Sequence, residues 1–243
     1  CAYMTGLKVK PEYQKKLLLI TEAYKRLEEK LADCAHVYTT ILDDNTPAIK
    51  LLEKRRKSIP PYIYLGHYMT FCFAGGRKML DVKIADRSDD KLVDRIKATC
   101  LPKYSFTPVD YKLLGFGDKN WYYYEENGEI LAACFVGDQK QYKQYKLCAY
   151  GGILKVASHL PTKLLGYPAF PKPGTIVNHG VLSYLYVKDN DKELCKKFIR
   201  SVVQATDYDL YIWGCFENHP LLQSFMELKT VHYGSRLYEV DYK

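Results

Sequence analysis

The chain has 243 residues, of which 47% are hydrophobic and 26% charged, so it can bury a sizeable core as one large domain or two smaller ones. It contains no run of about 18 apolar residues, which excludes a membrane-spanning helix, and its first residues lack the pattern of a secretory signal. The net charge of +8 is compatible with an anionic partner, such as a nucleic acid, a membrane surface or a phosphorylated cofactor.

The first part of the chain alternates between the residue spacings of strands and helices. Residues 14–31 place apolar residues at helical intervals, and residues 36–42 are rich in β-branched residues, which favour strands. Asn45 precedes a second helical pattern at Pro47, a combination typical of a capped helix start. In chain order, the predicted elements are a strand at 4–9, a helix at 14–31, a strand at 36–42, a helix from 47 and a strand at 62–73.

After Gly75 and Gly76 the pattern starts again. Two strand patterns flank Asn127-Gly128, and this pair predicts a tight hairpin because both residues tolerate positive φ angles. In chain order, the predicted elements are a strand at 82–85, a helix at 89–99, hairpin strands at 121–125 and 129–136, a helix at 153–159, a strand at 180–187, a helix at 192–205, a strand at 208–215, a helix at 220–226 and closing strands at 230–233 and 237–242.

The last predicted elements repeat the order of the first ones. The series of strand, helix, strand, helix and strand over residues 4–73 returns in the same order at the end of the chain. Such an echo predicts an α+β protein with two related units in tandem. The predicted division is a partial unit at 1–80 and a second domain at 81–243.

Two segments of the first unit resemble the GNAT acyltransferases. Residues 7–14 (LKVKPEYQ) resemble that family's fourth strand and the turn into its central helix, and residues 45–54 (NTPAIKLLEK) resemble the N-x-x-A-x-x-L segment after its fifth strand. In the second unit, Tyr184–Val187 and Glu217–Leu221 occupy the corresponding places. The resemblance implies the acyl-CoA N-acyltransferase-like fold, a mixed sheet flanked by helices.

The same resemblance implies an enzyme that transfers an acyl group from acetyl-CoA or another acyl-CoA to an amine of a small molecule or a peptide. Backbone groups of a splayed strand would pair with the pantetheine amides, and the unpaired N–H groups that open a helix would hold the pyrophosphate. By this resemblance, the cofactor-binding residues are Leu7, Val9, Gln14, Lys15, Lys16 and Asn45.

Several residues depart from the family's pattern. Leu17 and Leu19 stand where glycine or alanine is expected, and bulky side chains there block the approach of a phosphate to the backbone. In the second unit, the short turn at 188–191 has no glycine and carries two acids, which repel a phosphate. Leu52 and Phe225 replace a tyrosine that often protonates the leaving thiolate. These departures leave open a second hypothesis, a non-catalytic GNAT-like binding or scaffolding protein.

The beginning of the first unit departs from the family as well. It starts at what resembles the fourth strand, without the three strands that usually cover the sheet before it. Because an open sheet edge is normally covered, and because the chain starts with Cys1, we expect a longer protein with residues upstream. The sequence predicts neither the catalytic base nor the oligomeric state.

Each remaining candidate residue has a plain structural alternative. Asn45 can contact the cofactor or simply cap a helix. His179 and His219 flank the second unit's possible cleft and can act as bases, although an isolated histidine is more often structural. Glu125 and Glu126, beside the hairpin turn, are expected to be solvated.

Cysteine, histidine and tyrosine patterns narrow the remaining possibilities. The eight cysteines form no C-x-x-C pair, which favours reduced, buried thiols in a cytoplasmic protein over disulfides. The six histidines form no cluster with the spacing of metal ligands, so no metal site is predicted. Most of the 23 tyrosines follow strand patterns, so RNA binding is a third and weaker hypothesis. We expect neither a nucleic acid nor a membrane as partner.

Overall fold

The computed structural model describes residues 1–5, 10, 12, 17–54, 56, 59–75, 77–86, 89–100, 120–141, 143–158, 160 and 170–242. Packing within the chain defines two compact units. Unit 1 consists of Cys1–Met69 and Tyr233–Lys243, and unit 2 consists of Thr70–His232. The sequence predicts a boundary after residue 80 from the repeated order of its elements. The division by packing does not test that boundary, which stays a prediction.

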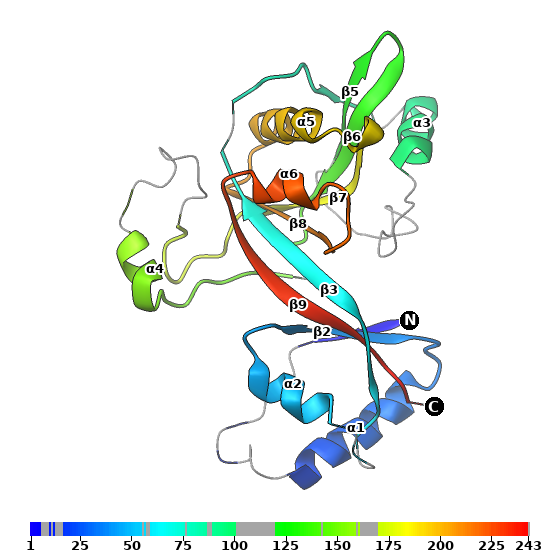
Figure 1. The fold of residues 1–243 in the computed structure, drawn as a ribbon, viewed down its shortest axis with the longest axis vertical. Helices are drawn as coiled ribbons and strands as arrows, with labels where there is room; N and C mark the ends of the chain where they lie inside the picture. The colour runs from blue at the N-terminus through cyan, green and yellow to red at the C-terminus, as the bar shows by residue number, and fades with distance from the viewer. Residues whose placement is uncertain are drawn as a thin grey trace. The chain divides into compact units, whose positions relative to one another are not determined.

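Unit 1 is a small mixed sheet with two helices (Figure 1). Along the chain it contains β1 (Ala2–Met4), α1 (Leu17–Leu31), β2 (Val37–Leu42), α2 (Thr46–Leu52), the first part of β3 (Tyr62–Phe73) and most of β9 (Thr230–Val240). The strand order is β1-β2-β9-β3, with β1 parallel to β2 and β2 antiparallel to β9. The last strand of the chain therefore lies between two strands that form near its beginning.

The core of unit 1 lies between the sheet and its two helices. Ile41 of β2 packs in one cluster with Ile20 and Tyr24 of α1 and with Ile49 and Leu52 of α2. Ile20 and Tyr24 are four residues apart, so they share one face of α1. Each buried aliphatic side chain stabilises the fold by about 1.5–3 kcal/mol. The amphipathic helix and the β-branched strand that the sequence predicts are confirmed.

A polar network lies where α2 ends against β9. The hydroxyl of Tyr238, a fully buried residue, donates to Oε1 of Glu53 at 2.6 Å, and Nη1 of Arg236 donates to the same oxygen at 2.8 Å. The hydrogen bond from Tyr238, more than that from Arg236, lowers the pKa of the Glu53 carboxyl. Burial and the hydrogen bond to Glu53 raise the pKa of Tyr238.

We expect this network to make unit 1 sensitive to acid. A carboxyl whose pKa is lowered by folding stabilises the fold above its unfolded pKa, and that contribution is lost as the pH falls through the folded pKa. Glu53→Gln keeps an acceptor oxygen without the charge, so it should lose less stability than the wild type between about pH 7 and about pH 3. Urea unfolding followed by circular dichroism measures the difference, with Glu29→Gln on α1 as the control. An acid dependence unaltered by Glu53→Gln would contradict the prediction.

Unit 2 is a larger sheet with helices packed on it (Figure 1). After the end of β3 it contains β4 (Lys83–Ile84), α3 (Asp90–Cys100), β5 (Asn120–Glu126), β6 (Glu129–Gly137), α4 (Gly152–Ala157), β7 (His179–Val187), α5 (Lys192–Gln204), β8 (Leu210–Phe216) and α6 (Leu222–Met226). The strand order is β3-β8-β7-β6-β5-β4. Strand β7 is parallel to β8. The three other pairs, β7 with β6, β6 with β5 and β5 with β4, are antiparallel.

The hairpin of β5 and β6 lies between β7 and the edge strand β4 of this sheet. Asn127 and Gly128 have φ angles of 50° and 79°, as a two-residue type I′ turn requires, so the predicted hairpin is confirmed. Successive residues of a strand face opposite sides of the sheet. Phe135 of β6 packs in a cluster with Ile96 of α3, and the preceding Cys134, on the other side, is also fully buried. Both faces of β6 are therefore covered.

A second core of unit 2 forms beneath α5 and α6. Phe198 of α5 and Phe225 of α6 are fully buried. The ring of Phe225 stacks on Trp213 of β8, with 3.9 Å between the ring centroids, and lies 5.6 Å from that of Phe71 of β3. This aromatic packing holds the end of β8 against the helix that follows it.

One prediction about the strands is wrong. Residues 230–233 and 237–242 do not form two closing strands, because β9 is a single strand that continues through Gly234 and Ser235. Ser235 stays in the ladder and pairs with Leu42 of β2. A glycine inside a strand pattern marks either an interruption or the close approach of another group. The second explanation applies to Gly234.

Candidate functional site

In unit 2, two central parallel strands pair only at their beginnings. His179–Val181 of β7 is in register with Leu210–Ile212 of β8. The ladder is confined to these pairs, although β7 continues to Val187 and β8 to Phe216, and the whole of both strands is described. Parallel strands that part in this way leave backbone N–H and C=O groups outside the ladder. Such groups can pair with the amides of an extended ligand.

Strand β7 also carries a β-bulge on its other edge, where it pairs with β6. The register shifts between Ala133 and Phe135 of β6, so that β7 has one extra residue at this point. Tyr184 has a φ of 54°, which is unusual for a tyrosine, and its buried ring lies 5.2 Å from that of Trp121. Packing thus holds a backbone conformation that costs about 1–3 kcal/mol, and strain of this kind is often found at functional sites.

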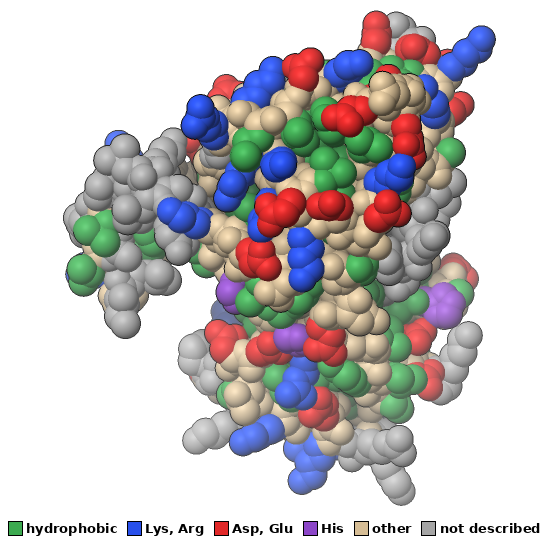
Figure 2. Space-filling model, turned by 45° about the horizontal axis from the view of Figure 1, so that its top comes forward, with side chains coloured by type: hydrophobic (Ala, Val, Ile, Leu, Met, Phe, Trp, Pro, Cys, Tyr) green, Lys and Arg blue, Asp and Glu red, His purple; other side chains and the backbone are tan. Residues whose placement is uncertain are grey.

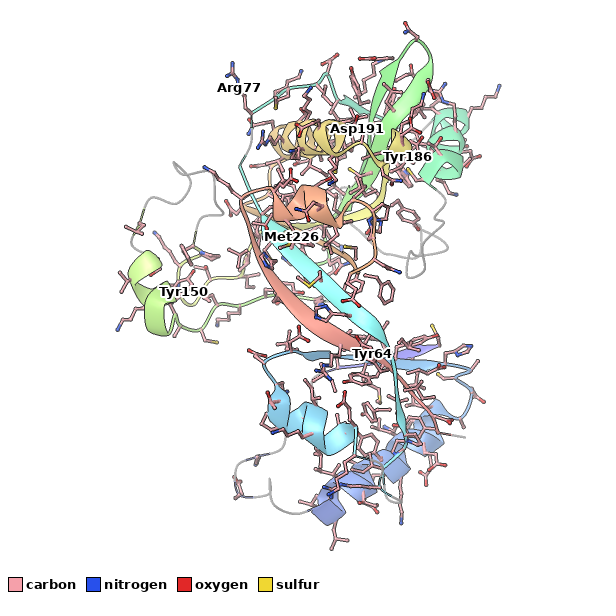
Figure 3. The ribbon with its side chains drawn as sticks, in the orientation of Figure 1. Tyr64, Arg77, Tyr150, Tyr186, Asp191 and Met226 are labelled. Carbon is pink, nitrogen blue, oxygen red and sulfur yellow. The ribbon has the colours of Figure 1, made fainter. Side chains whose placement is uncertain are left out.

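The turn from β7 into α5 does not suit a pyrophosphate. In the 3₁₀ turn Lys188–Asn190, Asp189 and Asn190 have φ angles of 55° and 53°, and there is no glycine. Asp191 caps α5, since its Oδ1 accepts from the N–H of Leu194 at 2.8 Å. Figure 3 shows Asp191 at the start of this helix. The cap adds negative charge and uses an N–H group that a phosphate would need.

Unit 1 has a corresponding parallel pair. Ala2–Met4 of β1 is in register with Val37–Thr39 of β2, which runs on to Leu42. The helices of this unit have no acidic residue in their first turns, in α1 from Leu17 and in α2 from Thr46. The first described turn of α1 therefore lacks the acidic residues that make the α5 start of unit 2 unfavourable for an anionic ligand, whereas Asp43 and Asp44 stand just before α2.

Most of the residues that the sequence assigns to cofactor binding lie outside the described residues, namely Leu7, Val9, Gln14, Lys15 and Lys16. Asn45 is described and is the N-cap of α2, where its Oδ1 accepts from the N–H of Ala48 at 3.3 Å. The residue is exposed. The capping role considered from the sequence is thus present, and a contact with the cofactor stays a prediction.

A histidine–aspartate pair lies at the same end of β2 as Asn45. Nε2 of His67 on β3 is 2.6 Å from Oδ2 of Asp43, the residue after β2. Strand β9 lies between their strands, and the two side chains meet at Gly234. A Cβ atom at Gly234 would lie 2.5 Å from Nε2 of His67 and still nearer to Oδ2 of Asp43, so a larger residue there would displace these side-chain ends. Both side chains stay partly exposed, 26% for His67 and 43% for Asp43.

Sequence reasoning missed this pair. His67 and Asp43 are 24 residues apart and belong to strands that are not adjacent in the sheet. Asp43 fits a cap before α2, and His67 is one histidine within an aromatic strand. The available signal was Gly234 inside an alternating strand pattern, because glycine at such a place often marks the close approach of other groups.

The two histidines considered as bases from the sequence have structural contacts. His179 is fully buried, with Nδ1 3.1 Å from the carbonyl oxygen of Val177. Nδ1 of His219 accepts from the N–H of Leu221 at 3.1 Å. Burial lowers the pKa of His219 to about 4, so its ring is neutral at physiological pH. Its contact with the chain that leads into α6 fits a structural role.

The structure also shows the burial and contacts of four other residues that the sequence analysis considered. Leu52 and Phe225, in the places of the family's thiolate acid, are both buried in the cores. Glu125 forms an ion pair with Arg95, and its side chain is only 19% exposed, so it is less solvated than expected. Glu126 is exposed, as expected.

Further observations concern metals, membranes and charge. In the described ranges, no group of three or more histidine, cysteine or acidic side chains is placed to hold a metal ion. Every helix that the structure describes is too short or too polar to cross a membrane. The eight cysteines have free thiols, and four of them are buried: Cys100, Cys134, Cys195 and Cys215. On the face shown in Figure 2, basic and acidic side chains are interspersed.

Comparisons of the sequence and the structure with known proteins show which proteins share this fold. No protein-family model and no curated protein matches the sequence. A GCN5-related N-acetyltransferase from Sphaerobacter thermophilus matches the structure with a TM-score of 0.56 and 10% identity, over 95% of this chain and 70% of that one. Another from Kribbella flavida has a TM-score of 0.53 and 7% identity, over 92% and 76%. Saccharomyces cerevisiae N-myristoyltransferase with bound myristoyl-CoA has a TM-score of 0.51 and 10% identity, over 99% and 62%.

At these identities the likeness concerns the fold. The chain has the acyl-CoA N-acyltransferase fold of the GNAT proteins, as the sequence resemblance implies, and the predicted mixed sheet flanked by helices is confirmed. The chain spans 54% of the length of a GCN5-related N-acetyltransferase from Anabaena variabilis, a match with a TM-score of 0.42.

Proposed function

We propose that this protein is an N-acyltransferase that transfers an acyl group from acetyl-CoA or another acyl-CoA to an amine of a small molecule or a peptide. The observation that supports the proposal is a fold shared with acyltransferases, in which unit 1 has a parallel pair of strands, β1 and β2. Backbone groups outside such a ladder can pair with the pantetheine amides, and a helix start offers N–H groups to a pyrophosphate.

We further propose that the donor binds in unit 1. The first described turn of α1 contains no acidic residue, whereas α5 of unit 2 begins at a cap formed by Asp191 and has Glu193 in its first turn. A diphosphate would be repelled there and would compete with the cap for N–H groups. In unit 1, the residues proposed to contact the donor are Leu7 and Val9 through their backbone groups, Gln14, Lys15 and Lys16 near the pyrophosphate, and Asn45.

We also propose that the chain holds two related units in tandem. The series β1-α1-β2-α2-β3 and the series β7-α5-β8-α6-β9 have the same order of elements, and each begins with a parallel pair of strands. Two units derived from one ancestor, at 1–80 and 81–243, would account for this repeat. One of them can then lose the donor site while the other keeps it.

Calorimetric titration of the full chain with acetyl-CoA and with longer acyl-CoAs tests the proposal. Lys15→Glu reverses a charge beside the proposed pyrophosphate site and is expected to weaken binding about tenfold or more. Lys192→Glu makes the same change in the first turn of α5 in unit 2 and serves as the matched control, with no change in affinity expected. Mass spectrometry of the products from a panel of amines then detects the transfer.

Two outcomes would overturn the proposal. Equal losses of affinity in Lys15→Glu and Lys192→Glu would contradict a donor site confined to unit 1. No binding of any acyl-CoA up to millimolar concentration would remove the enzyme proposal and favour a binding or scaffolding protein.

A further inference from the structure

We infer that an arm of unit 2, formed by residues 143–158, 160 and 170–177, binds the surface of a membrane that contains anionic lipids. From the sequence alone we expect no membrane as partner, and the side chains of the arm change that expectation. The inference does not depend on the proposed acyltransferase activity. It rests on the charge of the arm, on the exposure of its aliphatic side chains and on the way in which the two kinds of side chain are placed together.

The base of the arm is attached to the sheet of unit 2 between β6 and β7. The N–H of Leu147 donates to the carbonyl oxygen of Thr175 at 3.3 Å, and the N–H of Gly174 donates to that of Leu147 at 2.7 Å. The N–H of Val177 donates to the carbonyl oxygen of Tyr145 at 2.9 Å. These hydrogen bonds join the two limbs of the arm. The ring of Tyr145 packs against that of the buried His179 at the start of β7, with 4.9 Å between the centroids.

Further contacts join the limbs next to α4. The rings of Tyr150 and Phe170 pack edge to face with 5.2 Å between their centroids. The hydroxyl of Tyr150 donates to the carbonyl oxygen of Pro171 at 2.7 Å. Figure 3 shows Tyr150 beside α4. The described part of the arm is therefore a folded feature with defined contacts, and its exposed side chains belong to one structure.

The arm carries most of the positive charge of the chain. Residues 139–178 contain six lysines and neither arginine nor an acidic residue, hence a charge of +6, whereas the net charge of the whole chain is +8. The described lysines of the arm are all exposed, namely Lys143, Lys146, Lys155 and Lys172. Elsewhere in unit 2, Lys188 and Lys196 form ion pairs with glutamates. The arm has no acidic residue of its own that could neutralise its lysines in the same way.

Exposed aliphatic side chains stand among these lysines. Val156 follows Lys155 in α4 and is 70% exposed, and Leu160 is 55% exposed. Ile176 is 52% exposed and is the partner of Lys146 in an antiparallel bridge between the two limbs. Facing residues of an antiparallel pair hold their Cβ atoms about 4.5–5.5 Å apart, so a charged and an aliphatic side chain lie side by side here.

This combination fits a membrane surface better than a nucleic acid. Each lysine near anionic headgroups raises the affinity about fivefold, and aliphatic side chains enter the boundary between headgroups and acyl chains. A nucleic acid uses the charges but offers no apolar layer to the aliphatic side chains. A helix needs about 20 residues to cross a bilayer, and α4 has 6, so the arm would lie on the membrane.

Sedimentation of the full chain with lipid vesicles tests the inference. We expect binding to vesicles of phosphatidylcholine with phosphatidylserine, and much weaker binding to vesicles of phosphatidylcholine alone. Binding should weaken as salt is added, because salt screens exposed charges over about 8 Å at physiological ionic strength. Amide hydrogen exchange in the presence of the same vesicles should become slower in the arm, while exchange in the hairpin of β5 and β6 should not change.

Charge reversal tests the lysines. One variant reverses three exposed lysines of the arm: Lys143→Glu, Lys146→Glu and Lys172→Glu. The matched control reverses three exposed lysines of α3 and α5: Lys91→Glu, Lys192→Glu and Lys197→Glu. We expect the arm variant to bind vesicles with phosphatidylserine about a hundredfold or more weakly, and the control to lose less than about tenfold. Both variants have the same net charge, so the difference between them isolates the place of the charges.

A second pair of variants tests the aliphatic side chains at constant charge. Val156→Ser with Ile176→Ser removes two of them from the arm, and Ile84→Ser with Val231→Ser, each 51% exposed, does so elsewhere in unit 2. We expect the arm variant to bind vesicles with phosphatidylserine about tenfold more weakly, because less apolar surface leaves water on binding. The control should keep the affinity of the wild type. Circular dichroism checks that all four variants are folded.

Several outcomes would overturn the inference. One is the absence of any preference of the wild type for vesicles with phosphatidylserine, and another is an equal loss of affinity in an arm variant and its control. A loss on charge reversal without any loss in Val156→Ser with Ile176→Ser would show that charge alone acts. Tighter binding of an RNA than of these vesicles, through the same lysines, would then favour a nucleic acid as partner. None of these outcomes depends on whether an acyl-CoA binds.

Discussion

Phe225→Ala is expected to lower the free energy of unfolding of unit 2 by about 3–5 kcal/mol. Phe225 is fully buried, and its ring stacks on Trp213 at a centroid distance of 3.9 Å. It also contacts Phe71 and Phe73, with centroids 5.6 and 5.5 Å away. Truncation removes the buried ring, leaves a cavity among rigid aromatic neighbours and deletes aromatic pairs worth about 0.5–1.5 kcal/mol each.

Met226→Ala is the matched control for this variant. It makes a substitution to the same residue at the next position of α6, where Met226 is 42% exposed (Figure 3). Its effect should stay within about 0.5 kcal/mol. Urea unfolding followed by tryptophan fluorescence measures both variants, and it reports on unit 2 because Trp121 and Trp213 are the two tryptophans of the chain. Equal stabilities of Phe225→Ala and Met226→Ala would show that α6 does not close this core.

Ile96→Ala is expected to destabilise unit 2 by about 2–5 kcal/mol through a different cluster. Ile96 on α3 is fully buried and belongs to the cluster that contains Trp121, Phe135 and Tyr184. The helix is held to the sheet by this contact, and the strained backbone of Tyr184 is held by the same packing. We therefore expect the loss of Ile96 to loosen the bulge in β7 as well.

Lys91→Ala on the exposed side of α3 is the control for Ile96→Ala. Alanine suits a helix at both positions, so the difference between the two variants isolates the buried contact. Tryptophan fluorescence during urea unfolding again gives the stability. Amide hydrogen exchange of β7 measures the bulge, where Ile96→Ala should accelerate exchange near Tyr184 and Lys91→Ala should not. Unchanged exchange in Ile96→Ala would mean that the bulge does not depend on this cluster.

Sequence patterns predict the local elements of this protein well, for identifiable reasons. The hairpin follows from Asn127 and Gly128, whose positive φ angles few other residues adopt readily. The helix α5 follows from apolar residues at helical spacing, behind a cap at Asp191 that the structure contains. The acids of the turn before it predict that this helix start is unfavourable for a phosphate, and this stays a prediction. Each of these features depends on residues close together in the chain.

The errors arise where distant segments meet. The predicted break after residue 233 is absent because β2 pairs with β9 through Ser235, and no local property of residues 230–242 reveals that partner. For the same reason, the sequence did not bring His67 and Asp43 together. Their contact depends on a third strand that comes from the far end of the chain and presents a glycine between them.

The sequence by itself determined the order of helices and strands up to the last strand, and the resemblance to the fold family, because hydrophobic spacing and capping residues act over a few neighbouring residues. Only the tertiary structure decided that β7 and β8 part after three residue pairs and that His67 meets Asp43 across Gly234. Strand order and register set these distances, and they follow from the packing of side chains on segments far apart in the chain.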